Sequence, residues 1–191
     1  MISAILLAAG QSRRMNGENK LTKKFQNIPL VKHAVENILS SNIDELIIIL
    51  GYQENMIEKI IGKNKKIKFV LNKNFKTGMA SSIIVGLQQL SKMTESFFIC
   101  LGDMPLINSN VYNQLIISKK INNKEIIVPT YKGSQGNPVL FSISMKKQIM
   151  NIKGDAGAKK ILEKNKDKIF HLETNHQGIL KNYNTQDNFN N

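Results

Sequence analysis

The chain of 191 residues is 41% hydrophobic and 21% charged, proportions that are typical of globular proteins and exclude wholesale disorder. No apolar run approaches the roughly 18 residues that a membrane-spanning helix needs, so we expect no membrane segment. The formal net charge of +13 suits a polyanionic small molecule. It does not favour nucleic acid, because the lysines are spread over the whole chain and the aromatic residues are not interleaved with them.

The first predicted element is a buried strand at Ser3–Ala8. No basic segment precedes this apolar start, and Arg13 and Arg14 follow it, which is the opposite polarity to a signal peptide. The one cysteine, Cys100, cannot form an intrachain disulfide and fits a reducing compartment. We therefore expect a cytoplasmic protein.

Strands and helices then alternate along the chain. Short runs rich in Ile, Leu and Val predict further strands at Glu45–Leu50, Ile67–Leu71, Phe97–Leu101 and Ile126–Pro129. Amphipathic patterns between them predict helices at Leu30–Ser40, Gln53–Ile61, Ala80–Leu90 and Ser109–Lys119. Later come the turn-rich Tyr131–Pro138, a strand at Val139–Phe141, helices at Ser144–Met150 and Ala156–Glu163, and a polar tail after Asn182 that we expect to fray. This order predicts one three-layer α/β/α domain over residues 1–191, with a mostly parallel, Rossmann-like sheet.

The loop after the first strand is the first candidate site. Ala8, Ala9 and Gly10 let a ligand approach the backbone closely, and Arg14 and Lys20 add positive charge near the same point. Fixed backbone donors together with cations suit a triphosphate. Neither G-x-G-x-x-G nor the P-loop pattern occurs here. An ordinary strand end followed by a solvated basic loop remains the alternative.

A second candidate loop runs from Asn72 to Ser82. It brings Gly78 and the hydroxyls of Ser81 and Ser82 to the start of a predicted helix, an arrangement that can face an anion. Simple capping of that helix explains the same residues equally well.

Asp103 follows the fourth predicted strand, at the same sheet edge as Gly10. A carboxylate there is well placed to hold Mg²⁺ on phosphates, because Mg²⁺ takes few protein oxygens and completes its shell with water and phosphate. The alternative is that Asp103 caps the turn that Pro105 opens.

Residues Leu7-Ala8-Ala9-Gly10-x-Ser12-x-Arg14-Met15, with Asn19-Lys20-Leu21 beyond, resemble the signature of the MobA-like NTP transferase superfamily. Within that superfamily they are most similar to the molybdenum cofactor cytidylyltransferase (MocA) branch. The resemblance implies a fold of the nucleotide-diphospho-sugar transferase type, with a nucleotide-binding part at about 1–107 and an acceptor-binding part at about 108–187. It also implies that the loop from Leu7 to Gly10 cradles the nucleotide and that Lys20 contacts its phosphates. Asn16 stands where the family usually has Gly.

The resemblance assigns further roles. Gly102-Asp103-Met104-Pro105 is similar to the family's metal motif, which implies Asp103 as the Mg²⁺ ligand and, with Arg14 and Lys20, as a catalytic residue. It implies a nucleotide pocket lined by Asn72, Gly78, Ser81 and Ser82. It implies an acceptor side formed by Gly136, Asn137, Pro138 and Asp155. Asn137 stands where the family commonly has His, and Asn182 stands where it has a candidate second metal ligand, an Asp. Asp155 is as well suited to cap the following helix as to contact a ligand.

The activity that the resemblance implies is transfer of CMP from CTP to molybdopterin, with release of pyrophosphate. Ala9 favours the smaller pyrimidine, because the guanylyl-transferring relatives typically carry Gly at this position. A GTP- or UTP-using enzyme acting on another phosphorylated acceptor is the nearest alternative, and a non-catalytic nucleotide or nucleic-acid binder is a second. His33, His171 and Cys100 show no arrangement typical of a catalytic triad. A molybdoenzyme or its chaperone is a further expected partner, because the product must be delivered.

Overall fold

The structure, a computed structural model, describes residues 1–12, 18–155, 157 and 159–184. Its main sheet has the order β10-β7-β9-β6-β1-β4-β5, and a short strand β8 pairs with β7. The strands are β1 (Ile2–Ala8), β4 (Glu45–Leu50), β5 (Ile67–Leu71), β6 (Ser96–Leu101), β7 (Ile126–Tyr131), β8 (Ser134–Gln135), β9 (Val139–Ser142) and β10 (Ile169–Glu173). A separate hairpin is formed by β2 (Lys24–Phe25) and β3 (Ile28–Pro29).

Most neighbouring strands of the main sheet run parallel. β1 pairs in parallel with β4 and β6, β4 with β5, and β7 with β10, whereas β9 is antiparallel to both β6 and β7. The predicted mostly parallel sheet is therefore confirmed. As a result, the carboxyl ends of β6, β1, β4 and β5 meet at one edge, where ligands bind in folds of this kind.

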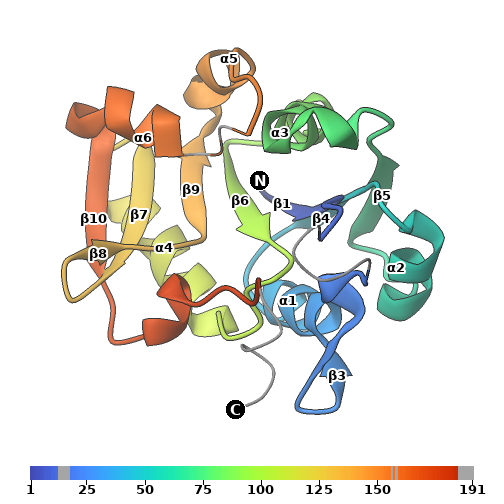
Figure 1. The fold of residues 1–191 in the computed structure, drawn as a ribbon. Helices are drawn as coiled ribbons and strands as arrows, with labels where there is room; N and C mark the ends of the chain where they lie inside the picture. Colours follow the sequence, from blue (N-terminus) through green and yellow to red (C-terminus); the bar gives the residue numbers. More distant parts are fainter. Residues whose placement is uncertain (13–17, 156, 158, 185–191) are drawn as a thin grey trace.

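Helices cover both faces of the sheet, and α3, α5 and α6 lie along its upper side in Figure 1. The helices are α1 (Leu30–Leu39), α2 (Glu54–Ile61), α3 (Met79–Gln88), α4 (Ser109–Ile121), α5 (Lys146–Ile149) and α6 (Lys159–Lys164). Buried residues of α1, α2 and α4 form one apolar cluster with one face of the sheet, and those of α3, α5 and α6 form another with the opposite face. The three-layer α/β/α prediction is confirmed. In the described part of the chain, no helix is long and apolar enough to cross a membrane.

Several elements differ from the predictions. The strand β10 and the β2–β3 hairpin were not predicted, because β10 is a short edge strand interrupted by His171 and each hairpin strand has two residues. The helix predicted at Ser144–Met150 is a 3-10 turn followed by the four-residue α5. The helix α6 begins at Lys159, whereas the sequence predicted a start near Ala156, a residue outside the described part.

Cys100 lies inside β6 and is buried and free. Burial raises its pKa to about 12, so at neutral pH the side chain is a protonated thiol. Because the thiolate is the reactive form of cysteine, Cys100 is a residue of the core and not a reactive residue.

Candidate functional site

A cavity of about 570 Å³ opens at the carboxyl ends of β1, β5 and β6. The following described residues line it: Leu7, Ala9, Gly10, Gln11, Lys20, Leu21, Phe75, Lys76, Thr77, Gly78, Met79, Ser82, Leu101, Gly102, Asp103, Gly154, Asp155, Asn182 and Asn184. The cavity thus unites the predicted first loop, the loop before α3, the predicted metal carboxylate and part of the predicted acceptor side. These segments are far apart in sequence, and those that follow β1, β5 and β6 meet because the parallel strands end at one edge.

Lys20 stands at the charged end of this cavity. Its Nζ donates to Asp103 Oδ2 and to Asn184 Oδ1, each at 2.5 Å. The side chains of Lys20 and Asp103 are 19% and 10% exposed, so the pair is largely shielded from water. The Lys20 backbone is held as well, since its N–H donates to Ser12 Oγ at 3.0 Å. A cation and a carboxylate are therefore fixed side by side in one largely enclosed place.

The segment 182–184 closes the cavity beside this pair. The Tyr183 N–H donates to the Asp103 carbonyl at 2.9 Å, and the Tyr183 ring packs against Phe25 with centroids 5.1 Å apart. Desolvation by burial raises the Tyr183 pKa. We predicted fraying after Asn182, but these contacts hold Tyr183 and Asn184 in place; residues 185–191 lie outside the described part.

Asn184 is a site residue that the sequence analysis missed. Asn182 and Asn184 both line the cavity, but it is Asn184 that shares the Lys20 ammonium with Asp103. A signal was present, since Asn184 lies two residues after Asn182, which the resemblance already singled out. The role of Asn182 as a metal ligand stays a prediction.

The residues of the first loop differ in their surroundings. Leu7, Ala9 and Gly10 line the cavity, whereas the Ala8 side chain is buried in the core below it. The Ala9 carbonyl accepts from the Tyr52 N–H at 3.2 Å, which ties the loop to the end of β4. The predicted catalytic residue Arg14 and the departure at Asn16 lie outside the described residues.

Asn72 is a buried residue that connects the second loop to the start of α3. It is 2% exposed, and its Nδ2 donates to Ser81 Oγ at 2.9 Å and to Ser82 Oγ at 3.0 Å. Its Oδ1 accepts from the Asn74 N–H at 2.9 Å. Gly78 and Ser82 line the cavity, whereas Asn72 and Ser81 are not among the described lining residues. The geometry indicates that Asn72 positions the loop.

Replacing Asn72 by alanine is expected to destabilise the protein by about 1–3 kcal/mol, because buried polar partners lose their hydrogen bonds. Urea denaturation of the variant measures this change in the free energy of unfolding. Asn74→Ala is the matched control, since Asn74 is exposed and contributes its backbone amide and carbonyl to these bonds. Equal stability of the two variants would contradict the positioning role.

The acceptor-side loop occupies the start of α3. The Gly154 carbonyl accepts from the Ala80 N–H at 3.0 Å, and Asp155 Oδ1 accepts from the Met79 N–H at 3.3 Å. The backbone amides of Met79 and Ala80, at the helix start that could face an anion, therefore already have hydrogen-bond acceptors. Asp155 therefore caps α3, because the fold brings this loop against a helix 76 residues away in sequence.

Gly136, Asn137 and Pro138 lie at the same sheet edge but outside the described lining of this cavity. Val139 pairs with Ile99, which sets the preceding residues beside the end of β6. The Asn137 N–H donates to the Ile179 carbonyl at 3.0 Å, and the Asn137–Pro138 peptide is cis. Their predicted contact with an acceptor stays a prediction.

The oxygens near Lys20 fit a metal that shares its ligands with a substrate. Asp103 supplies a carboxylate, and Asn182 and Asn184 supply amide groups. Among the described residues, no group of three or more His, Cys, Asp or Glu side chains could hold a metal. Mg²⁺ is commonly bound by one or two carboxylates together with phosphates and water. The donor set suits that mode and does not suit an all-protein cage.

The histidines and the cysteine do not contribute to the cavity. His33 Nε2 lies 2.7 Å from the Phe25 carbonyl, His171 is exposed on β10, and Cys100 is buried. The cavity instead offers fixed charge and backbone groups, which bind and orient an anionic ligand.

Comparisons with known proteins relate the chain to one family. The family described as MobA-like NTP transferase domain matches residues 4–169. A probable molybdenum cofactor guanylyltransferase of Natranaerobius thermophilus is 34% identical over 134 residues, 69% of this chain and 62% of that protein. Another probable molybdenum cofactor guanylyltransferase, from Methanosarcina acetivorans, is 27% identical over 154 residues, 78% of this chain and 66% of that protein. The chain thus spans slightly less than two thirds of each relative.

Solved structures share the fold. The protein Rv0371c of Mycobacterium tuberculosis superposes with a TM-score of 0.86 at 21% identity, over 98% of this chain and 95% of that one. A complex of Rv0371c with manganese superposes with a TM-score of 0.74 at 19% identity, over 91% and 87% of the two chains. The 4-diphosphocytidyl-2C-methyl-D-erythritol synthase of Anaerococcus prevotii gives 0.79 at 15% identity, over 98% and 92%.

Proposed function

The chain belongs to the MobA-like NTP transferase family, and from this membership we propose that it is a cytoplasmic, metal-dependent nucleotidyltransferase. The observation that carries the proposal is the Lys20–Asp103 pair, held beside Gly10 in a cavity at the strand ends. In this proposal Lys20 binds phosphate oxygens, and Asp103 binds the ion that accompanies them. In the absence of a ligand, the charges of Lys20 and Asp103 neutralise each other.

The proposed reaction is one direct displacement. A phosphate oxygen of the acceptor attacks the α-phosphorus of the nucleoside triphosphate, a new P–O bond forms, and the bond to the β-phosphate oxygen breaks to release pyrophosphate. Lys20 stabilises charge on the phosphates, and the backbone at Gly10 orients them. Arg14 is proposed for the same charge-stabilising role. A bound divalent ion supplies charge neutralisation at the phosphates.

CTP is the proposed donor and molybdopterin the proposed acceptor, giving molybdopterin cytosine dinucleotide. Ala9 supports a pyrimidine, because this residue lines the cavity and carries a methyl group that a glycine would lack. GTP is the second candidate, since both curated relatives described above are named guanylyltransferases. Transfer of the product to a molybdoenzyme or its chaperone belongs to the same proposal.

A donor screen tests this function. The protein is incubated with molybdopterin, Mg²⁺ and either CTP, GTP, UTP or ATP, and released pyrophosphate is measured. We expect release with CTP, which stops when molybdopterin is omitted or Mg²⁺ is chelated. Turnover of GTP alone would overturn the base assignment. Binding of nucleotides without any turnover would favour the non-catalytic binder.

A further inference from the structure

The strand order gives the cavity two chemically different ends. Asp103 follows β6 and Phe75 follows β5, and the order β6-β1-β4-β5 separates these two strands by three strand spacings. At about 4.8 Å per spacing, the ends of these two strands are about 14 Å apart, and the Phe75 ring reaches back from β5 to Gly51 at the end of β4. The largely buried pair of Lys20 and Asp103 marks the charged end, whereas the other end is lined by Phe75 and Met79 and by the exposed Lys76. A nucleotide whose phosphates lie at Lys20 therefore has its base directed toward Phe75.

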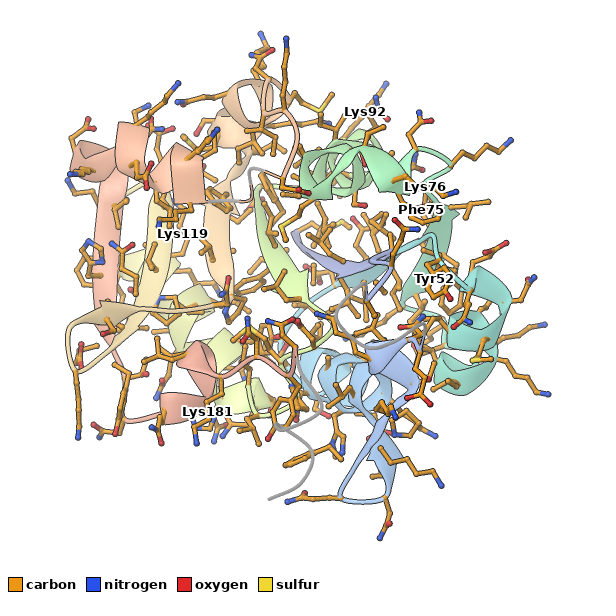
Figure 2. The ribbon with its side chains drawn as sticks, in the orientation of Figure 1. Tyr52, Phe75, Lys76, Lys92, Lys119 and Lys181 are labelled. Carbon is orange, nitrogen blue, oxygen red and sulfur yellow. The ribbon has the colours of Figure 1, made fainter. Side chains whose placement is uncertain are left out.

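Phe75 is the one aromatic residue among the described residues that line the cavity. Its ring lies beside two small residues, Gly51 and Ala9, which together are called its seat. A Cβ atom added to Gly51 would come within 2.8 Å of Phe75 Cγ and 2.8 Å of Ala9 Cβ. Cγ of the ring therefore lies directly against the Gly51 backbone, on the side of Gly51 that also faces the Ala9 methyl group. Figure 2 shows Phe75 and Lys76 together near β5, with Tyr52 nearby.

The backbone that carries Phe75 is held by several hydrogen bonds. Phe75–Thr77 forms a 3-10 turn in which the Phe75 N–H donates to the Asn72 carbonyl at 3.3 Å. The Thr77 N–H and Oγ1 both donate to the Asn74 carbonyl, at 3.0 and 2.8 Å. Asn72 is itself anchored to α3 through its side chain. The ring is thus positioned before any ligand binds, and a half-buried aromatic face is offered at low entropic cost.

We propose that Phe75 is the base-stacking residue of this site, seated on Gly51 and Ala9. The inference rests on the proposed function in that the ligand is a nucleoside triphosphate. Every nucleobase has a π face, so stacking on Phe75 supplies affinity for CTP and GTP alike and does not choose between them.

Binding measurements without any acceptor test this inference. The dissociation constants of CTP, GTP and inorganic tripolyphosphate are measured with Mg²⁺ by calorimetry. Phe75→Leu keeps an apolar side chain on the seat but has no π face, and Phe75→Ala removes both. We expect each variant to bind both nucleotides about 5-fold to 150-fold more weakly and to bind tripolyphosphate as the wild type does. Phe75→Tyr is expected to retain nucleotide binding.

Leu71→Ala is the matched control, because Leu71 ends β5, is 46% exposed and is not among the described lining residues. It should leave all three affinities unchanged. Wild-type nucleotide affinity in Phe75→Leu would overturn the inference, as would an equal loss of tripolyphosphate binding, since that loss indicates a structural role. If the Phe75 variants lose nucleotide affinity as expected but the donor screen shows no turnover, the proposed reaction is overturned and the stacking role stands.

Discussion

Asp103→Asn is expected to lower the rate of pyrophosphate release at least about a hundredfold, because it removes the carboxylate that faces Lys20 and the proposed metal. The amide has nearly the same shape, and the backbone carbonyl that accepts from the Tyr183 N–H remains. Folding is therefore expected to survive. The measurement is the rate with saturating CTP, molybdopterin and Mg²⁺, together with a thermal unfolding curve for each protein.

Asp167→Asn serves as the control for this loss of charge. Asp167 is exposed in the 3-10 turn Lys166–Lys168 and does not line the cavity, so its replacement should leave the rate unchanged. If Asp103→Asn retained a rate within tenfold of the wild type, the proposed metal and phosphate role of this carboxylate would be wrong.

Gly78→Ala is expected to have the largest effect on stability, lowering the free energy of unfolding by about 2–5 kcal/mol. Gly78 has a φ of 114° and a ψ of 170°, a region that is open essentially to glycine alone. In addition, an added Cβ atom would lie 2.5 Å from the carbonyl carbon and oxygen of Gly154. The substitution therefore strains the backbone and also pushes the acceptor-side loop away from α3. Urea denaturation measures the change.

Gly62→Ala separates these two effects. Gly62 has a φ of 77° and a ψ of −178°, but a Cβ atom added there meets nothing within 4 Å. Its replacement should cost only the backbone strain, about 1–3 kcal/mol. The excess cost at Gly78 measures the contact with Gly154. Equal costs at the two positions would show that this contact does not contribute to stability.

Much of the fold could be predicted from the sequence because the buried strands are continuous apolar runs. Glu45–Leu50, which is buried along almost its whole length, is a strand at the predicted bounds. Residues buried on both faces leave this pattern whatever their neighbours are. β10 leaves no such pattern, because an edge strand exposes alternate residues such as His171 and Glu173. Its place in the sheet depends on pairing with β7, which the local sequence does not encode.

The candidate site, too, could be predicted from the sequence only in part. The motifs around Gly10 and Asp103 predicted one end of the cavity, because strand ends in a parallel sheet share an edge. The partners of those residues could not be predicted, since they come from distant segments. The sequence left capping of the following helix and ligand contact equally open for Asp155, and its hydrogen bond to the start of α3 was not foreseen. Nothing in the sequence marks Gly51 as the residue on which the ring of Phe75 lies.

The hydrogen bond from Lys20 to Asn184 joins residues that are 164 positions apart. During synthesis, the strand β1 and its loop leave the ribosome early, and the segment that carries Asn184 leaves long afterwards. Throughout that interval the Lys20 ammonium has no Asn184 to contact, whatever part of the sheet has formed. The charged end of the cavity is thus completed late, and the nascent chain acquires its full set of ligand-binding groups only after nearly all of the described chain has been made.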